Sequence, residues 1–421
     1  MGSNIVAAID VGTNKTYTLI SEIEENGAAK VIGYGIARTS GITQGIIVNP
    51  ENVAKSISAS VKKAEEMAAT KGVDIKITSA AFSVGDRYLE SCTKASAIKL
   101  SDKPREITAS DKKELEDNVE KKYSDSGKML LHKSVYNYRV DESGIVKEPI
   151  GKVGTRLEAV VFLVFGKKKN IDDLEAVAAK AGIKMDKVYF KNWATTNAAA
   201  GEDERKSGII VVDVGAGTTT ISIVKNGRMI YTTVIPMGGD SFTNDIAVVL
   251  DIDRDSAEGI KREIAVLSSE VIKNETIEIE SKGKTVEVEL LQVKEILDAR
   301  SEELLENINN KIEESNFAEL AINGIAFTGG AVKTSGFIDK ARRVLNRPVR
   351  VADMQHIKGF EESLHRHEGV TGAGLMALVL SENQTKSEPK KQGKIKKEKI
   401  KNENGSFFER FTEKLKSLIF E

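Results

Sequence analysis

A strand–turn–strand–turn–strand pattern occurs twice in this sequence, about two hundred residues apart, and it defines the architecture more firmly than any other part of the chain. In each copy the second turn is an Asn-Gly pair between apolar runs, at Asn26-Gly27 and at Asn226-Gly227. This pair is a strong hairpin signal because both residues tolerate the positive φ angles that a tight hairpin turn requires. The sequence therefore predicts two equivalent three-stranded units.

The first turn of each copy holds an aspartate followed two residues later by a glycine: Asp10 with Gly12, and Asp213 with Gly215. Glycine lets backbone N–H groups close around an anion, and the carboxylate can face a metal ion. Two such turns facing each other would hold the phosphates of a nucleotide together with Mg²⁺. Asp10 and Asp213 are therefore the candidate catalytic and metal-binding residues, holding Mg²⁺ through water. The candidate nucleotide-binding residues of the two loops are Gly12, Thr13, Asn14, Lys15, Gly215, Ala216, Gly217, Thr218 and Thr219.

Other interpretations of these loops are weaker. A single Asp-x-Gly-Thr would be an ordinary glycine turn, because short glycine motifs give many false positives. Two copies in the same strand context argue against that interpretation. Neither loop has the form Gly-x-x-x-x-Gly-Lys-Ser/Thr or the form Gly-x-Gly-x-x-Gly at the start of a helix, since both loops lead into strands.

The composition is typical of a globular α/β protein with more than one domain. A chain of 421 residues exceeds a single core, and its net charge of −1 argues against a nucleic-acid-binding surface. The single Cys92 has no partner for an internal disulfide, so a reducing compartment is expected. We see no signal peptide or membrane-spanning run. The histidines lack metal-ligand spacing and are expected on the solvated surface: His132, His356, His365 and His367.

Residues 85–155 are richer in charge and irregular turns, and they predict a subdomain inserted into the first half of the chain. Within it we expect a helix at Asp111–Tyr123 capped by Ser110 and a strand at Met129–Val140, and the strand Arg156–Phe165 leads out. Strands alternating with helices predict mixed sheets with helices on both faces. The other expected helices are Pro50–Lys71 with Asn49 as N-cap, Asn170–Ala181, Asp240–Ser269, Gln292–Ser315 and Gly369–Leu380, and the other expected strands are Ile75–Val84, Lys184–Lys191, Gly324–Thr328 and a hairpin in Glu275–Leu291.

Two further features fit the far side of a bound nucleotide. Gly329 and Gly330 follow a buried strand, where paired glycines let the backbone approach a ligand, although a plain strand-to-helix turn also explains them. Glu258 and Lys261 lie three residues apart on an expected helix and share a face. They would hydrogen-bond a ribose or form an ordinary surface ion pair.

The C-terminal region divides into a polar part and an apolar part. Residues 381–405 hold eight Lys and four Glu with almost no apolar side chains, which predicts a disordered basic linker. Residues 406–421 predict an amphipathic helix that favours an anionic lipid surface, with a groove on a partner protein as the alternative. Its apolar stripe consists of Phe407, Phe408, Phe411, Leu415, Leu418 and Ile419.

The two Asp-Gly loops, the Gly329-Gly330 loop and the glycine-rich last helix together resemble the superfamily of actin, Hsp70 and sugar kinases. Within it the chain resembles the FtsA family of bacterial cell-division proteins, on the loop Asp10–Lys15, the insertion between Val84 and Phe165, and the amphipathic C-terminus. This resemblance covers essentially the whole chain. The fold class it implies is α/β and actin-like (ribonuclease H-like): duplicated domains around a nucleotide cleft, with an inserted α+β subdomain.

The resemblance implies an ATP-binding protein with Mg²⁺ at the division septum, on the cytoplasmic face of the cell membrane. Such a protein polymerises with itself, binds other division proteins, and tethers the tubulin-like FtsZ by binding the C-terminal tail of FtsZ. Nucleic acid is not an expected partner. The helix Gln292–Ser315 would help to bind that tail, with Arg300 as the main basic contact and Lys294 as the weaker candidate. Basic residues suit a partly acidic tail.

The resemblance also divides the chain into subdomains. The first lobe, 1A, comprises residues 1–84, 166–200 and the closing helix 361–380, and the insertion 1C comprises residues 85–165. The second lobe, 2A, comprises residues 201–239 and 301–360, and subdomain 2B comprises residues 240–300. The disordered linker at 381–405 and the amphipathic helix at 406–421 follow.

One departure from active ATPases of this superfamily concerns the helix that connects the lobes. Those enzymes place a Gln or Glu there to position the attacking water, whereas this chain has Asn192–Asn197 without a carboxylate. Hydrolysis is therefore expected to be slow at most, with nucleotide used mainly for conformation and assembly.

Other members of the superfamily fit less well. A kinase would need a catalytic aspartate and a sugar pocket that the sequence does not reveal, and an Hsp70-like chaperone would need a substrate domain after residue 380. A PilM-like type IV pilus assembly protein is the alternative, because it shares the fold and the insertion but normally lacks a lipid-seeking tail.

Overall fold

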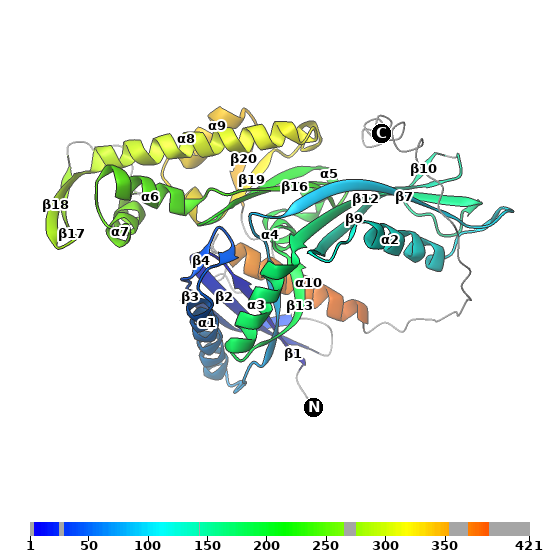
Figure 1. Cartoon of the computed structure of the whole chain (residues 1–421), viewed down its shortest axis with the longest axis horizontal. Coiled ribbons are helices and arrows are strands. Elements are labelled where there is room, and N and C mark those ends of the chain that lie inside the picture. The colour runs from blue at the N-terminus through cyan, green and yellow to red at the C-terminus, as the bar shows by residue number, and fades with distance from the viewer. Residues whose placement is uncertain (1–3, 25–28, 143, 265–274, 353–368, 387–421) are drawn as a thin grey trace.

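The structure, a computed structural model, describes residues 4–24, 29–142, 144–264, 275–352 and 369–386. Two lobes meet in the middle of an elongated molecule, with the inserted subdomain at one end and a helical subdomain at the other (Figure 1). Several expectations fall outside the described residues: the Asn26-Gly27 turn, three of the histidines (His356, His365 and His367), the linker beyond residue 386 and the amphipathic helix at 406–421.

The first lobe is a five-stranded sheet with β13, β6 and β1 parallel to one another and β1, β2 and β3 antiparallel. Helices cover both faces, because alternate residues of the strands belong to two separate apolar clusters. The strands lie in the order β13 (Lys184–Phe190), β6 (Ser79–Val84), β1 (Asn4–Val11), β2 (Lys15–Ile23) and β3 (Ala29–Arg38). The helices are α1 (Pro50–Thr70) and α3 (Lys168–Lys180) on one face, and α4 (Lys191–Ala199) and α10 (Val370–Lys386) on the other. The short strands β4 (Ile42–Thr43) and β5 (Ile46–Ile47) form a separate pair.

The second lobe repeats this sheet strand for strand, which confirms the predicted duplication. Its second turn has φ angles of 55° at Asn226 and 70° at Gly227, as the predicted hairpin requires. The strands lie in the order β16 (Arg228–Ile235), β15 (Thr219–Lys225), β14 (Ile209–Val214), β19 (Ile325–Thr328) and β20 (Val349–Val351). The short elements around it are α5 (Glu202–Ser207) and the 3₁₀ turns η1 (Ala318–Leu320) and η2 (Gly330–Lys333).

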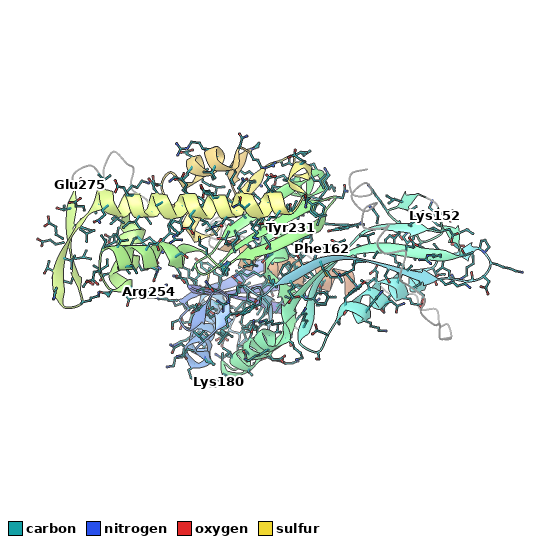
Figure 2. The ribbon with its side chains drawn as sticks, turned by 45° about the horizontal axis from the view of Figure 1, so that its top comes forward. Lys152, Phe162, Lys180, Tyr231, Arg254 and Glu275 are labelled. Carbon is teal, nitrogen blue, oxygen red and sulfur yellow. The ribbon has the colours of Figure 1, made fainter. Side chains whose placement is uncertain are left out.

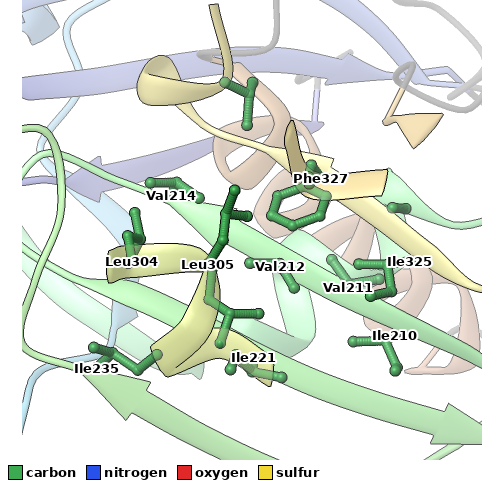
Figure 3. Packing of buried hydrophobic residues seen from close by; sticks show 14 of the residues in the cluster. Ile210, Val211, Val212, Val214, Ile221, Ile235, Leu304, Leu305, Ile325 and Phe327 are labelled. Carbon is green, nitrogen blue, oxygen red and sulfur yellow. The ribbon is translucent and has the colours of Figure 1, made fainter. Parts of the chain in front are cut away.

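The long helix α8 (Leu290–Glu314) and α9 (Phe337–Leu345) pack against one face of the second sheet. Figure 3 shows Leu304 and Leu305 of α8 lying over Val212, Ile221 and Phe327 of the strands, and all five side chains are fully buried. The opposite face packs against α4, which also contacts the first sheet. A single helix thus lies between the two lobes.

A helical subdomain extends from the second lobe at the left of Figure 1. It consists of α6 (Gly239–Val249), α7 (Arg254–Ile264), the first part of α8, and the hairpin β17 (Thr276–Ser281) with β18 (Lys284–Glu289). The hairpin was predicted, and its turn residues Lys282 and Gly283 have φ angles of 52° and 73°.

The inserted subdomain is a four-stranded antiparallel sheet with α2 (Ala109–Tyr123) on one face. Its other face packs against the second lobe, because Tyr136, Phe162 and Val164 belong to the same buried cluster as the strands β14 to β16. Figure 2 shows Phe162 and Tyr231 at this junction, with Lys152 at the far end of the insertion. The strands lie in the order β10 (Ile145–Val146), β9 (Lys128–Val140), β12 (Arg156–Lys167) and β7 (Glu90–Lys99), beside the pair β8 (Arg105–Glu106) and β11 (Val153–Gly154).

Some predicted boundaries are wrong. Thr108, not Ser110, caps α2: its hydroxyl accepts from the Asp111 N–H, and the Asp111 carboxylate accepts from the Thr108 N–H. The helix expected at 240–269 is two helices, because Asp251 takes a φ of 50° and Asp253 accepts from Ser256 N–H at the start of α7.

The last helix and the first strand of the insertion also differ from expectation. Helix α10 continues to Lys386, six residues beyond its predicted end at Leu380, and an ion pair from Glu382 to Lys187 of β13 joins this extension to the sheet. Strand β7 was not predicted; it is formed by continuous pairing with β12. None of the helices in the described part of the chain is both long and apolar enough to cross a membrane.

His132 is not the solvated surface residue that we expected. Its ring lies 5.1 Å from the centre of Trp193 and 5.9 Å from that of Phe190, and its Nε2 is hydrogen-bonded to Ser134 Oγ at 2.8 Å. Burial lowers the pKa of this imidazole to about 4. The ring is therefore neutral in the folded protein at neutral pH.

Acidification is expected to destabilise the protein through His132. The unfolded chain takes up a proton at this residue below pH 6.5, whereas the folded protein does so only near pH 4. The free energy of unfolding therefore falls between these values, by up to about 1.4 kcal/mol per pH unit from this group. Urea titrations of the wild type and of His132→Phe at pH 7 and pH 5 measure the effect. The wild type should lose more stability than the variant, and equal losses would contradict the prediction.

Candidate functional site

A cavity of about 410 Å³ lies between the two lobes, and both Asp-Gly loops line it. The predicted loop residues on its wall are Asp10, Gly12, Thr13, Asn14, Lys15, Asp213, Gly215, Ala216, Gly217 and Thr218. Glu258, Lys261, Gly329 and Gly330 line the same cavity. The structure therefore brings together residues that are more than three hundred positions apart in the sequence, from Asp10 to Gly330.

The two loops have the same backbone turn. Gly12 N–H donates to Lys15 O at 2.9 Å, and Gly215 N–H donates to Thr218 O at 3.0 Å. They also approach each other, because a Cβ atom added to Gly217 would lie 2.7 Å from Thr13 Oγ1. The backbone N–H groups of two facing turns are well suited to an anion such as a phosphate chain.

The carboxyl ends of β1, β6 and β13 meet at one edge of the first sheet, since these strands are parallel neighbours. This brings Asp10, Ser83 and Lys191 together. The Ser83 hydroxyl donates to Asp10 Oδ1, and Lys191 Nζ lies 3.0 and 3.3 Å from the two Asp10 oxygens. Only 12% of the Asp10 side chain and 19% of the Lys191 side chain are exposed.

Asp213 faces this cluster from the second lobe. Burial raises the pKa of its carboxyl to about 6, an effect that Lys191 opposes and Asp10 reinforces. Burial also works to lower the pKa of Lys191, but the charges of Asp10 and Asp213 outweigh it and raise that pKa. The lysine therefore stays protonated and can donate hydrogen bonds but cannot accept a proton.

The charged residues at the Asp10 end of the cavity suit a magnesium ion that is bound through its coordinated water molecules. Within the described residues no group of three or more His, Cys, Asp or Glu side chains could enclose a metal ion. Mg²⁺ commonly keeps several waters and binds through one or two carboxylates together with substrate phosphates. Asp10 and Asp213 supply two such carboxylates on the cavity wall.

Glu258 and Lys261 lie at the other end of the cavity, on α7. They form an ion pair of 2.6 Å, and both bind the Thr243 hydroxyl, at 2.6 and 2.7 Å. About one-sixth of each side chain is exposed. They are therefore a largely buried ion pair in the cavity wall, and their hydrogen bonds to a ribose stay a prediction.

Gly329 follows β19 directly behind Asp213. Its φ is 95°, and a Cβ atom there would lie 2.3 Å from Val214 O and 2.6 Å from Asp213 Oδ1. Only glycine meets both demands. The paired glycines thus keep the Asp213 loop and the cavity wall in close contact.

Sequence reasoning misplaced one residue of the site. Thr219 does not belong to the cavity lining of the described structure: it is fully buried, and its hydroxyl donates to Met237 O at 2.9 Å. Its neighbour Thr220 lines the cavity instead, because successive side chains of a strand point to opposite faces.

Several lining residues were not predicted. Lys191 stands at the end of the predicted strand Lys184–Lys191, so the position of that strand's carboxyl end was the signal that could have found it. Gly85, Gly239, Lys333 and Thr371 also line the cavity. Thr371 lies in the glycine-rich last helix, whereas the other three come from a loop, a helix start and a short turn that have no distinctive pattern.

The two candidate partner-binding residues on α8 face different neighbours. Arg300 binds Asp245 of α6 and Glu303, with Nη2 2.9 Å from Asp245 Oδ1 and Nη1 2.6 Å from Glu303 Oε2. Lys294 donates to Ser335 O at 3.0 Å, beside α9. Only 22% and 10% of their side chains are exposed. Arg300 is thus the more accessible of the two.

Comparisons with protein-family models and with related sequences show which family the chain belongs to. A family model described as cell division protein FtsA matches residues 210–374, and a model of the SHS2 domain inserted in FtsA matches residues 87–165. A model of the type IV pilus assembly protein PilM matches residues 137–269. The cell division protein FtsA of Buchnera aphidicola (subspecies Baizongia pistaciae) is 31% identical over 360 residues, which are 82% of this chain and 83% of the relative. The chain belongs to the FtsA family of cell division proteins.

Other FtsA proteins match at similar length. That of Pseudomonas aeruginosa is 29% identical over 379 residues, which are 89% of each chain, and that of Escherichia coli K12 is 27% identical over 382 residues, 88% of this chain and 89% of the relative. The insertion, with its sheet of β7, β9, β12 and β10, is the segment that the inserted-domain model matches.

Solved structures confirm the actin-like fold. The PilM–PilN type IV pilus biogenesis complex matches with a TM-score of 0.61 at 13% identity, over 89% of this chain and 98% of that chain. MreB5 of Spiroplasma citri bound to AMPPNP matches with a TM-score of 0.54 at 12% identity, over 92% of this chain and 99% of that chain. At this identity the PilM likeness concerns the fold alone, and the curated relatives favour FtsA.

Proposed function

We propose that this FtsA-family protein binds ATP between its lobes, polymerises, and tethers FtsZ filaments to the cytoplasmic face of the membrane at the division septum. The cavity lined by both Asp-Gly loops supports the nucleotide part of this proposal. Two matched backbone turns face each other there, with a cation between their aspartates and an ion pair at the opposite end.

The contacts suggest how ATP would lie. The N–H groups of the two turns would bind the phosphates, and Glu258 and Lys261 would hydrogen-bond the ribose. Asp10 and Asp213 would hold Mg²⁺ through water, which would neutralise phosphate charge. Lys191 begins the connecting helix, and its protonated amine has no lone pair that could accept a proton from water. We therefore expect slow hydrolysis.

Loss of nucleotide binding is expected for Asp213→Ala, because the carboxylate facing the phosphates through Mg²⁺ is removed. The affinity for ATP with Mg²⁺, measured by calorimetry, should fall about tenfold or more. Asp102→Ala is the matched control, since that aspartate is 89% exposed in the insertion. Unchanged ATP affinity in Asp213→Ala would count against the site.

Turnover in the wild type should stay far below that of Hsp70-type or kinase enzymes.

The membrane part of the proposal depends on residues 406–421. An apolar stripe of three phenylalanines beside lysines would insert into an anionic lipid surface, and each nearby lysine would add roughly 1 kcal/mol of attraction. The basic segment before it would lengthen the connection to the folded lobes.

Sedimentation with anionic liposomes tests this anchor. Binding should disappear when residues 406–421 are deleted or when Phe408 and Phe411 become Glu, because charge on the apolar stripe opposes insertion. Ser417→Glu adds a negative charge on the polar face and should leave most of the binding intact, as a matched comparison with the single change Phe411→Glu. Retained binding after the deletion would refute a C-terminal anchor.

The FtsZ part of the proposal rests on the surface around Arg300. Asp245, which pairs with Arg300, is followed one turn later on α6 by Val248 and Val249, which are 70% and 55% exposed. A guanidinium beside exposed apolar side chains suits a peptide with acidic and apolar residues. The Glu303 carboxylate already accepts a hydrogen bond from the Arg300 guanidinium and would compete with such a peptide.

If Glu303 competes with the peptide for Arg300, substitutions of Arg300 and of Glu303 should have opposite effects on peptide binding. Arg300→Met should weaken binding of a synthetic FtsZ C-terminal peptide about tenfold or more, as expected for loss of a charge-assisted hydrogen bond. Glu303→Gln should strengthen it, because the arginine then has a free donor pair. Fluorescence anisotropy with the labelled peptide measures both, and Lys311→Met, at the other end of α8, is the control. If all variants bound the peptide with equal affinity, the FtsZ site would not lie at Arg300.

A further inference from the structure

Lys191 lines the cavity, and neither the family comparison nor the motif analysis accounts for its charge. It is the first residue of α4, directly after β13, and it lines the cavity. Its Nζ would lie 4.0 Å from a Cβ atom on Gly12, and its own Cβ would lie 2.9 Å from one on Gly85. The lysine is thus enclosed by glycine backbone on the phosphate side of the site.

The ammonium group of Lys191 has hydrogen-bonding capacity left for a ligand. An ammonium offers three N–H donors. Within the described structure its hydrogen bonds go to the two oxygens of Asp10 alone. Because Lys191 also lines the cavity, a donor remains for an oxygen atom placed there.

The charge at this end of the cavity favours such a donor. Asp10 and Asp213 both carry carboxylates on the wall, and a triphosphate brings about four further negative charges. Without a cation between them, carboxylates and phosphates repel each other. In the cluster of Asp10, Asp213 and Lys191, the lysine is the cation that the chain itself supplies.

We propose that Lys191 is a direct ligand of the terminal phosphates and that it takes over part of the charge neutralisation usually left to a divalent metal ion. The cleft would then hold ATP even when Mg²⁺ is scarce. This inference rests on the proposed binding of ATP in the cavity and adds to it the residue and the ion that govern the phosphate end.

The inference also accounts for the position of the lysine on the connecting helix. A side chain at the start of α4 faces the terminal phosphate, where a Gln or Glu would orient water. A protonated lysine there binds phosphate instead. The same residue would thereby favour retention of ATP over its hydrolysis.

Calorimetric titrations of the full chain with ATP and with adenosine, each in excess Mg²⁺ and in EDTA, test this role. In the wild type, removal of Mg²⁺ should weaken ATP binding by about tenfold but should not abolish it. In Lys191→Met, ATP affinity in EDTA should fall about tenfold to a hundredfold further, as for loss of a hydrogen bond to a charged group. Mg²⁺ should restore most of that affinity, and adenosine binding should not change.

Lys261→Met is the matched control, because it removes a lysine from the ribose end of the same cavity. It should weaken ATP and adenosine alike and leave the response to Mg²⁺ unchanged. Lys191→Arg, which keeps the charge, should retain binding in EDTA. Thermal unfolding of each variant without nucleotide reports its fold. If Lys191→Met is unfolded, Lys191→Gln, which keeps a donor for Asp10 but removes the charge, takes its place.

Two negative outcomes have separate meanings. A wild type that binds neither ATP nor adenosine would overturn the proposed nucleotide site itself. A wild type that binds both, together with a Lys191→Met variant of identical Mg²⁺ dependence, would leave the nucleotide site standing and overturn the role of Lys191.

Discussion

The carboxylate of Asp10 joins three segments that are remote in sequence, and the cleft depends on this contact. It receives hydrogen bonds from Ser83 and Lys191, which stand at the ends of the two strands parallel to its own. Buried polar groups are costly unless they are paired, so this arrangement fixes the edge of the first sheet where the loops begin. An unpaired Asp10 would leave a buried charge at the start of the Asp10–Lys15 loop.

Duplication of the sheet explains why a cleft forms at all. Each lobe presents the same hairpin loop at the same edge of an equivalent sheet, so two loops face each other when the lobes pack around α4. The helix is rich in small residues, and Ala194, Ala198 and Ala199 are fully buried. Their size lets the two sheets approach closely, which sets the width of the cavity.

The fold was largely predictable where local signals agree with tertiary structure. The Asn226-Gly227 turn, the Asn49 cap of α1 and the acidic loops depend on φ angles or local hydrogen bonds, which a short sequence window contains. Other features depend on residues far away. His132 is half-buried against Trp193 and Phe190, and Lys191 becomes a site residue only because β13 pairs beside β6.

Two other predictions failed for local reasons. Thr108 caps α2 through reciprocal hydrogen bonds with Asp111, three residues later, so this capping box was present in the sequence and was overlooked in favour of Ser110. Thr219 was assigned to the cavity on its motif, although the pleat of β15 turns its side chain inward. In both cases the local backbone geometry, and not the residue type alone, decides which side chain makes the contact.

The inserted sheet is continuous in sequence with the first lobe, yet it packs on the second. Tyr136 donates its hydroxyl to Ile230 O at 2.6 Å, and Arg228 donates to Tyr136 O at 2.6 Å, so the join is hydrogen-bonded as well as apolar. A rotation between the lobes displaces each atom in proportion to its distance from the hinge. The insertion is therefore a lever arm: a small closing of the cleft becomes a larger swing at its tip near Lys152 (Figure 2).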